Sequence, residues 1–380
     1  MSSHRIPFNR PSIVGQELEY VRAAIEGGHS AGDGPLTGRC SETLSSWLGG
    51  SRVLLTTSCT HALEMCALLL GIQEGDEVIV PSFAFVTSAG AFALHGAKPV
   101  FVDIRPDTLN LDENQLREKI NERTRAIVVL HYAGVACEMD TIQAISRETG
   151  VPIVEDNAHG LLGTYRGEPL GSFGCLATQS FHETKNFICG EGGALVVNRP
   201  DWVERAEILR EKGTDRSRFL RGQIDKYTWV DVGSSYLPSE ILAAFLLAQL
   251  EAREEIQARR TEIWQRYAAE LRDWADAQGV GLPQIPEHCS HPAHLFYMIL
   301  PSERSRARLI EHLAAEGILG VFHYQSLHLS EMGRKFGGQP GQCPVSERVS
   351  DRLLRLPLYC GLTEAEQADV IERVLSFNTD

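Results

Sequence analysis

The sequence predicts an α/β protein in which helices cover a mostly parallel sheet, followed by a smaller α+β unit. Over the first two thirds of the 380 residues, short apolar strand signals alternate with helical ones. These strands are apolar throughout, as is typical of strands buried on both faces of a parallel sheet. A loop rich in Gly and Pro at residues 279–286 then precedes a different pattern, which indicates a second unit.

The strands of the first unit are expected in short apolar runs that turn residues separate. Val53–Leu55 is the first, and the helix after it has apolar residues at i, i+3, i+4 and i+7 from Leu63. A Gly-Asp turn precedes the strand at 78–80, which Pro81 ends. Further strands are expected at 100–103, 126–130 and 153–155.

A long helical region after Pro238, ending near Trp274, is expected to connect the two units. We therefore predict a large α/β domain over residues 1–240, a connecting helix over 241–278 and a small C-terminal domain over 279–380. In the small domain, the pattern predicts strands at 296–300 and 320–323 and helices at 306–314 and 364–375.

The charge and cysteine content exclude several classes of protein. The formal net charge of −14 repels nucleic-acid phosphates and anionic lipids, so we expect neither a nucleic acid nor a membrane as partner. The longest apolar run, Ile241–Leu250, is half of the ~20 residues that a membrane span needs. Nine cysteines without a Cys-x-x-Cys pair are typical of reduced thiols, and residues 1–10 lack a signal-peptide core. We therefore expect a cytoplasmic protein.

Three segments hold polar side chains near the carboxyl ends of strands, where parallel sheets bind their ligands. Ser58, Cys59 and Thr60 begin a helix, where hydroxyl and N–H groups either bind an anion such as phosphate or merely cap the helix. Asp156 follows a buried strand and either pairs with a cation or caps a turn. Lys185 follows an apolar, aromatic segment and precedes a glycine-rich loop, although a single lysine is usually a surface charge.

Together, the three segments meet the needs of pyridoxal phosphate. Its phosphate needs an anion site, and its aldehyde needs an amine with which to form a Schiff base. Its ring nitrogen needs an acidic partner in order to stay protonated and withdraw electrons. The sequence therefore matches a pyridoxal-phosphate site in which Lys185 supplies the amine.

Short segments along the chain have the order and spacing of one enzyme family. They are residues 6–9, 31–34, 57–60, 81–85, 131–134, 155–159, 180–186, 210–214 and 322–324. Through them the chain resembles, over essentially its whole length, the nucleotide-sugar aminotransferase family of fold-type I pyridoxal-phosphate enzymes. Within that family it is most similar to the transaminases that form dTDP-4-amino-4,6-dideoxygalactose.

The resemblance implies a role for each matching residue around the cofactor. Lys185 forms the Schiff base and then moves the proton between the substrate carbon and the cofactor carbon. Asp156 faces the pyridine nitrogen, Phe85 stacks on the ring, and His159 lies near the ring hydroxyl. The residues that hold the phosphate are Ser58, Cys59, Thr60 and Ser180.

The resemblance also implies residues on the substrate side and at a subunit interface. His323 and Tyr324 are expected to face the substrate. Many family members have an Asn that reaches the cofactor phosphate across a homodimer interface, where this chain has residues 233–236 and Ser235 could substitute. Asn157 is a second departure, because the family more often has Ala there.

The implied reaction moves an amino group from L-glutamate, through pyridoxamine phosphate, to C4 of dTDP-4-keto-6-deoxy-D-glucose. The product is a dTDP-4-amino-4,6-dideoxyhexose with the galactose or the glucose configuration. A 4-keto pentose or a 3-keto hexose remains an alternative acceptor. A sugar dehydratase on the same fold is a further alternative, but it has His at the position of Lys185, and a relative without turnover would lack Lys185 or Asp156.

A metal site is not expected. His288, His291 and His294 lie close together in the sequence with Cys289, but Pro292 prevents a regular helix that would place them on one face.

Overall fold

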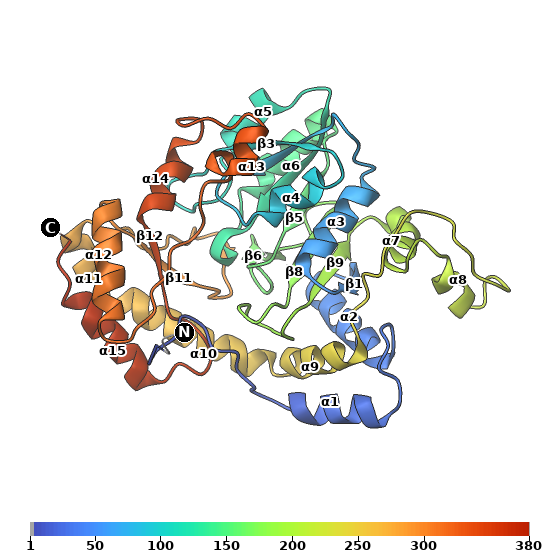
Figure 1. Ribbon diagram of the computed structural model, residues 1–380, viewed down its shortest axis with the longest axis horizontal. Helices are drawn as coiled ribbons and strands as arrows, with labels where there is room; N and C mark the ends of the chain where they lie inside the picture. The colour runs from blue at the N-terminus through green and yellow to red at the C-terminus, as the bar shows by residue number, and fades with distance from the viewer. Residues whose placement is uncertain (1–3, 380) are drawn as a thin grey trace.

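The computed structural model describes residues 4–379, and its central feature is a seven-stranded sheet (Figure 1). The strand order is β1-β9-β8-β5-β4-β2-β3. Strand β9 runs antiparallel to both of its neighbours, β1 and β8, whereas the other four pairings are parallel. The bounds are β1 Arg52–Thr56, β2 Glu77–Pro81, β3 Lys98–Val102, β4 Thr124–Leu130, β5 Ile153–Asp156, β8 Leu176–Ser180 and β9 Gly193–Val197. The predicted α/β class with a mostly parallel sheet is confirmed.

The five strands predicted in this region are all present, but β8 and β9 were not predicted. In β8 the polar residues Thr178 and Gln179 interrupt the apolar run, although both side chains are buried. Strand β8 lies inside the sheet, so tertiary packing determines its structure more than residue type does. Because these two strands flank it, Lys185 lies in the loop between β8 and β9 and not on a strand.

Helices cover both faces of the sheet, and the strands alternate their side chains between them. In β4, Ala126 and Val128 pack with α3 (Cys59–Leu69), whereas Ile127 and Val129 pack with α6 (Met139–Thr149). Next to β1 and β9 the second face is closed by α2 (Pro35–Trp47) and α9 (Glu240–Glu251). The remaining helices of this unit are α1 Glu17–Glu26, α4 Thr87–Ala93, α5 Leu116–Lys119, α7 Val203–Arg210 and α8 Arg216–Leu220, with 3₁₀ turns at Glu113–Gln115, Tyr132–Gly134 and Pro200–Trp202.

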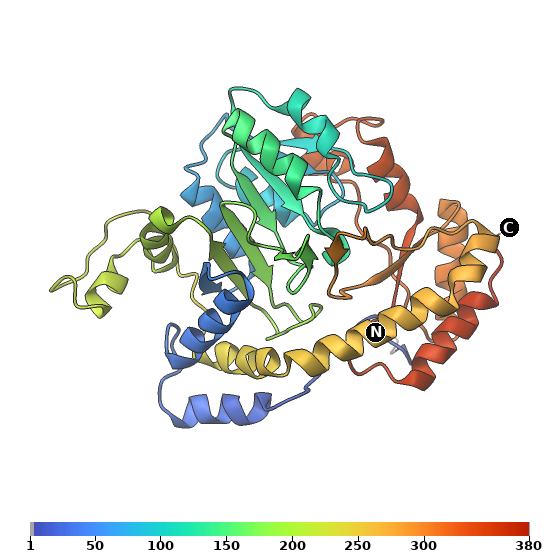
Figure 2. The ribbon, with the colours of Figure 1, turned by 180° about the vertical axis from the view of Figure 1, so that it is seen from behind.

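The connection after residue 238 consists of three helices rather than one. Helix α9 is followed by α10 (Arg253–Glu270) and α11 (Arg272–Gln278), with breaks at Ala252 and Leu271. Figure 2 shows α9 and α10 running end to end along one side of the molecule. Ile263 and Tyr267 of α10 belong to a second core, with residues of the C-terminal unit.

The C-terminal unit is built around the antiparallel strands β11 (Phe296–Ile299) and β12 (Leu353–Leu356). Its helices are α12 Glu303–Ala314, α13 Glu331–Lys335, α14 Pro344–Arg352 and α15 Glu364–Leu375, with a 3₁₀ turn at Leu327–Leu329. The strand predicted at 320–323 is wrong, because only Val321 forms a single bridge, to Arg355, before the chain turns and His323 lines a cavity. A small third sheet joins β10 (Cys289–Ser290) to β6 (Thr164–Tyr165) and β7 (Glu168–Pro169).

Within residues 4–379, no helix combines the length and the apolar content that crossing a bilayer requires.

Candidate active site

A cavity of about 950 Å³ lies at the carboxyl ends of β4, β5 and β8. These strand ends contribute Leu130, Asp156 and Ser180, and the start of α3 closes one side. The C-terminal unit supplies the opposite wall, through residues 321–327 and 355–358. Parallel sheets bind ligands at this edge, so the geometry places the candidate site here.

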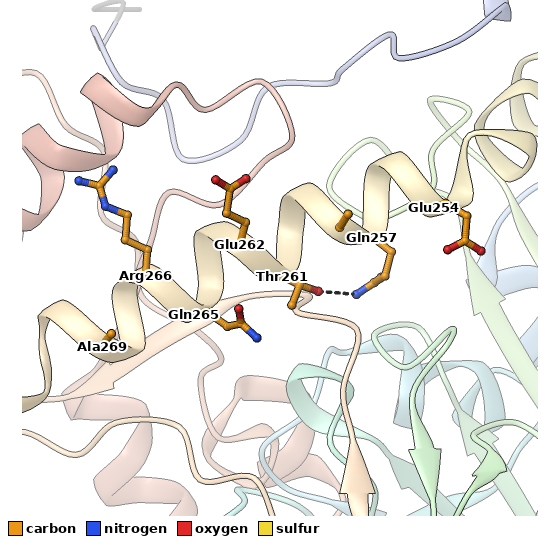
Figure 3. A pocket seen from close by; sticks show the side chains of 8 residues that line it. Glu254, Gln257, Thr261, Glu262, Gln265, Arg266 and Ala269 are labelled. Carbon is orange, nitrogen blue, oxygen red and sulfur yellow. Dashed lines mark hydrogen bonds between the residues drawn. The ribbon is translucent and has the colours of Figure 1, made fainter.

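A second hollow runs along the outer face of α10, and Figure 3 shows its lining side chains. Gln257 donates a hydrogen bond of 3.2 Å to Thr261 there, and Arg266 donates one of 3.0 Å to the Glu364 carbonyl. The eight residues that line this hollow include no Lys, His or Cys. It therefore contains none of the predicted site residues.

The start of α3 both caps its helix and offers an anion site. The Ser58 hydroxyl accepts a hydrogen bond of 3.1 Å from the His61 N–H, so Ser58 is an N-cap. The N–H groups of Cys59 and Thr60 precede the first intrahelical bonds and remain available to a ligand. Gly193, at the start of β9, lies so close that a Cβ there would come within 2.3 Å of the Cys59 nitrogen. The two interpretations of this segment are therefore compatible.

Asp156 is the last residue of β5 and is 3% exposed. Its Oδ2 accepts a hydrogen bond of 2.6 Å from the Ser88 hydroxyl, and its Oδ1 accepts one of 3.3 Å from the Ala158 N–H. Burial raises the pKa of Asp156, while the Ser88 hydrogen bond and the charge of Lys185 oppose that rise. The carboxylate is thus held at a dry strand end where a cationic partner stabilises its charged form.

Lys185 lies in the same cavity, in the loop that follows β8. Its N–H donates to the His182 carbonyl over 2.9 Å, which forms a turn that points the chain back toward the sheet. Burial lowers the pKa of Lys185 to about 8, although the nearby Cys59 and Asp156 favour its charged form. An amine with this pKa is partly neutral near pH 8 and can act as a nucleophile or a base.

Histidine and tyrosine rings form the wall beside Asp156. The His159 ring stacks on His294 at a centroid distance of 4.3 Å, and its Nε2 lies 3.3 Å from the Tyr324 hydroxyl. The Nδ1 of His323 lies 3.0 Å from the Tyr132 hydroxyl oxygen. Burial lowers the pKa values of His159, His294 and His323 well below their usual range, so all three rings are neutral at pH 7.

The remaining predicted residues divide between the cavity and the surface. Phe85 lines the cavity and is 53% exposed, with its ring centroid 6.2 Å from that of Tyr324. The cavity also includes Ser58, Cys59, Thr60, His159, Ser180, His323 and Tyr324. Ser235 is exposed and lies outside it, where it forms a bridge with Glu211. One chain thus assembles every predicted site residue except the one expected to reach across an interface.

The histidines weighed as metal ligands point in different directions. His288 packs on Tyr165 with ring centroids 5.0 Å apart, and His291 packs on Trp264 at 4.4 Å. Within residues 4–379, no group of three or more His, Cys, Asp or Glu is placed to hold a metal ion.

Sequence reasoning missed three residues that the fold brings to this site. Ser88 of helix α4 donates a hydrogen bond to Asp156. The Oδ1 of Asn186 lies 2.9 Å from the Nδ1 of His294, within hydrogen-bond distance. Arg355 lines the cavity from strand β12. The sequence holds no local signal for these contacts, because each partner is at least 68 residues away or belongs to the C-terminal unit.

A half-buried lysine, a buried carboxylate and a free helix start around one cavity of a mostly parallel sheet are the features of a fold-type I pyridoxal-phosphate enzyme. The chain belongs to the DegT/DnrJ/EryC1/StrS aminotransferase family, whose model matches residues 11–375. Its cofactor is pyridoxal phosphate.

Known proteins resemble the chain over nearly its full length. The spore coat polysaccharide biosynthesis protein SpsC of Bacillus subtilis is 30% identical over 98% of this chain and 97% of its own. The aminotransferase TlmJ from Streptoalloteichus hindustanus has 30% identity and a TM-score of 0.89, covering 98% of each chain. The putative sugar aminotransferase Spr1654 from Streptococcus pneumoniae has 27% identity and 98% coverage of each chain, with TM-scores of 0.91 in its PMP form and 0.89 in its PLP form.

The residues present fit this cofactor. Gly193 leaves room at the start of α3 that a Cβ would fill, which suits a phosphate group approaching the backbone. The buried Nδ1 of His159 has no partner within the described chain, so a polar group of a ligand can bind it. Asp156 can accept a hydrogen bond from the protonated ring nitrogen, and the Lys185 amine lies in the same cavity.

Proposed function

We propose that this enzyme transfers an amino group from L-glutamate to C4 of a nucleotide-linked ketosugar, dTDP-4-keto-6-deoxy-D-glucose. The product is a dTDP-4-amino-4,6-dideoxyhexose, and the resemblance favours the galactose configuration. The observation that supports amine transfer most strongly is the Lys185 amine, with a pKa of about 8, in one cavity with buried Asp156. The relatives support the sugar, since SpsC is named for polysaccharide biosynthesis and Spr1654 for sugar aminotransfer.

The size of the cavity also favours a large substrate. Ligand pockets commonly measure about 300–1,000 Å³, and this one, at about 950 Å³, lies at the upper end. It is bounded by two units of the chain, so a nucleotide sugar can enter beside the cofactor while its sugar ring faces Lys185. His323 and Tyr324 lie on the wall opposite the sheet and are proposed to contact that ring.

Bound pyridoxal phosphate supplies an electron sink for the negative charge that develops on the carbon bonded to nitrogen. In the first half-reaction, Lys185 removes the proton from the donor carbon that bears the amine. In the second, it returns a proton to the sugar carbon that receives the amine. Asp156 keeps a negative charge beside the ring nitrogen, and Ser88 holds the Asp156 carboxylate in place. Neutral His159 and His323 orient polar groups by hydrogen bonds without adding positive charge.

We further propose that two copies of the chain form a cytoplasmic homodimer. The segment from α8 to Ser235 extends away from the body of the protein (Figures 1 and 2). It exposes large apolar side chains, of which Trp229 is 77% exposed and Val232 53%. Apolar groups so exposed favour burial against a partner, and a second copy would bring Ser235 toward the partner's cavity.

A spectrophotometric titration tests the proposed reaction. The purified enzyme is converted to its pyridoxamine form with L-glutamate, freed of amino acid, and titrated with dTDP-4-keto-6-deoxy-D-glucose. We expect the visible absorption of the pyridoxal form to return, and NMR of the product then gives the configuration at C4. Persistence of the pyridoxamine form with this sugar, but its loss with a 4-keto pentose or a 3-keto hexose, would contradict the proposed acceptor.

A further inference from the structure

Arg355 presents a guanidinium group to the cavity with few partners in the protein. It is the one arginine among the residues that line this cavity. Its Nη2 donates a hydrogen bond of 2.9 Å to the Phe322 carbonyl, while its Nε is buried and has no acceptor within the described chain. An N–H group buried in this way normally finds an acceptor, so a ligand atom is expected there.

No carboxylate of residues 4–379 forms an ion pair with Arg355. The acidic residues that line the cavity, Asp156 and Glu191, have other partners: Ser88 for Asp156 and His182 for Glu191. The formal charge of the chain is −14, so acidic groups are plentiful, yet none lies against this arginine. Arg355 is half-buried and its Nε is fully buried, so leaving this guanidinium without a counter-ion has a desolvation cost that a bound anion would offset.

Arg260 shows how the protein treats a buried arginine that has no ligand to bind. Its guanidinium donates to the backbone carbonyls of Ala293, over 3.2 Å, and His294. Both its Nε and its Nη2 are therefore satisfied by the protein itself. Arg355 differs because, within residues 4–379, one carbonyl is its only acceptor and the rest of its donor edge is left for a ligand.

The Arg355 side chain is also held rigidly. The backbone of Arg355 has a neighbour on both sides: it stands opposite Tyr297 of β11 in the sheet, and on the other side its N–H donates to the Val321 carbonyl over 2.7 Å. The guanidinium carbon lies 4.5 Å from the centroid of the Phe8 ring, which covers one of its faces. Phe8 is fixed in turn by the next residue, Asn9, whose side chain donates to the Glu183 carbonyl over 2.9 Å in the loop that carries Lys185.

We infer that Arg355, covered by Phe8, is the subsite that binds the carboxylate of the amino donor. This inference rests on the proposed function and identifies the part of the site that selects an amino acid as donor. A planar guanidinium matches a carboxylate with two parallel hydrogen bonds. Arg355 lies near enough to Lys185 for its charge to act on that amine. An α-carboxylate is two bonds from the donor nitrogen, whereas the diphosphate of a nucleotide sugar is separated from C4 by the sugar ring.

A binding measurement tests this inference without requiring turnover. The holoenzyme is titrated with glutarate, a dicarboxylate that has no amine to transfer, and the shift in the cofactor's absorption gives the dissociation constant. Arg355→Gln should weaken glutarate binding about tenfold or more, because charge-assisted hydrogen bonds are lost. Arg355→Lys should restore part of the loss, and Phe8→Ala should weaken binding by a smaller factor. Arg272→Gln, an exposed position on α11 outside the cavity, is the matched control and should bind as the parent does.

The two half-reactions then separate the possible anions. Arg355→Gln should raise the half-saturating L-glutamate concentration about tenfold or more and leave the half-saturating concentration of the sugar nucleotide within about twofold. An equal effect on both substrates, an effect on the sugar nucleotide alone, or unchanged glutarate binding would each overturn the inference. If the parent enzyme binds glutarate through Arg355 but does not aminate the sugar, the inference stands and the proposed acceptor fails.

Discussion

At the residue scale, the chemistry depends on a lysine whose amine is partly neutral near pH 8. Burial lowers the pKa of Lys185 to about 8, with Cys59 and Asp156 opposing the shift and Arg355 adding to it. The neutral amine is the base, so its population rises as the pH rises through 8. In the pyridoxamine form, Lys185 is free to titrate. We expect the rate of sugar amination to increase about tenfold from pH 7 to pH 9 and then to level off.

Stopped-flow measurement of that half-reaction over this pH range checks the prediction. Arg355→Gln should move the midpoint upward, because it removes a positive charge that disfavours the charged amine. A rate that is flat across the range, or one that keeps rising to pH 10.5, would show that Lys185 titrates elsewhere or is not the base.

A second prediction at this scale concerns Asp156. Asp156→Asn keeps the shape of the side chain and its place beside Ser88 but removes the negative charge facing the ring nitrogen. We expect turnover to fall about a hundredfold or more, since the ring then withdraws electrons less strongly. Thermal unfolding should change little, because the pKa of this buried carboxyl is already raised and its neutral replacement costs little. Undiminished turnover would mean that the ring nitrogen has another partner.

Much of the site could be predicted residue by residue, but not its supporting contacts. Ser58, Asp156 and Lys185 each stand where local chemistry is informative: a helix start, a strand end and a glycine-rich loop. Ser88, Asn186 and Arg355 carry no such local mark, and their roles come from side chains distant in the sequence. The interval from 288 to 294 likewise contains three histidines that point to three different neighbours.

At the element scale, the start of helix α3 depends on the close approach of strand β9. Gly193 pairs with Thr56 in the sheet, and a Cβ at 193 would lie 2.3 Å from the Cys59 nitrogen and 2.4 Å from the Ser58 carbonyl carbon. Gly193→Ala should therefore displace the N–H groups that face the phosphate. We expect cofactor affinity to fall about tenfold or more, measured by fluorescence titration of the apoenzyme with pyridoxal phosphate.

Gly38 in helix α2 offers a control for that substitution. No atom lies within 4 Å of a Cβ built there, so Gly38→Ala should leave cofactor affinity unchanged and raise stability by about 0.5–1 kcal/mol. Equal cofactor affinity in the Gly193→Ala enzyme and the parent would show that the start of α3 does not hold the phosphate.

The elements that could be predicted are those whose periodicity is uninterrupted. The helix at 364–375 coincides with α15, because its apolar face and its Thr363–Glu366 capping box are both local features. Strand β8 was missed since two of its buried residues are polar, and the strand expected at 320–323 is reduced to one bridge at Val321. The connecting region appears continuous in its residue pattern, yet Ala252 and Leu271 divide it into three helices.

At the scale of the whole molecule, the exposed segment after α7 is expected to join two chains. Trp229 is 77% exposed, and Phe219, Tyr227 and Val230 are exposed on the same segment. Trp229→Asp should shift the sedimentation of the enzyme from that of a dimer toward that of a monomer, because burying an unpaired charge at an interface has a large desolvation cost. Lys98→Ala, on strand β3 at the other edge of the sheet, should leave the dimer intact. A monomeric parent enzyme would contradict the proposed assembly.

The two units also meet in one cavity, which explains why the whole chain is needed for the site. Asp156 and Lys185 come from the sheet side, and His323, Tyr324 and Arg355 come from the C-terminal side. Composition and strand pattern were sufficient to predict the layered sheet. They were not sufficient to predict which C-terminal side chains face it, because that depends on long-range contacts such as the one by which the Leu327 N–H donates to the Ser82 carbonyl over 2.8 Å.

The most direct test of this account is to find the lysine that joins the cofactor. The holoenzyme is treated with borohydride, which reduces a Schiff base to a stable amine, and its peptides are analysed by mass spectrometry. The account predicts one modified lysine, Lys185, in the parent enzyme and no modification in Lys185→Ala, with Lys98→Ala behaving as the parent. Attachment at any other lysine, or undiminished turnover by Lys185→Ala, would contradict it.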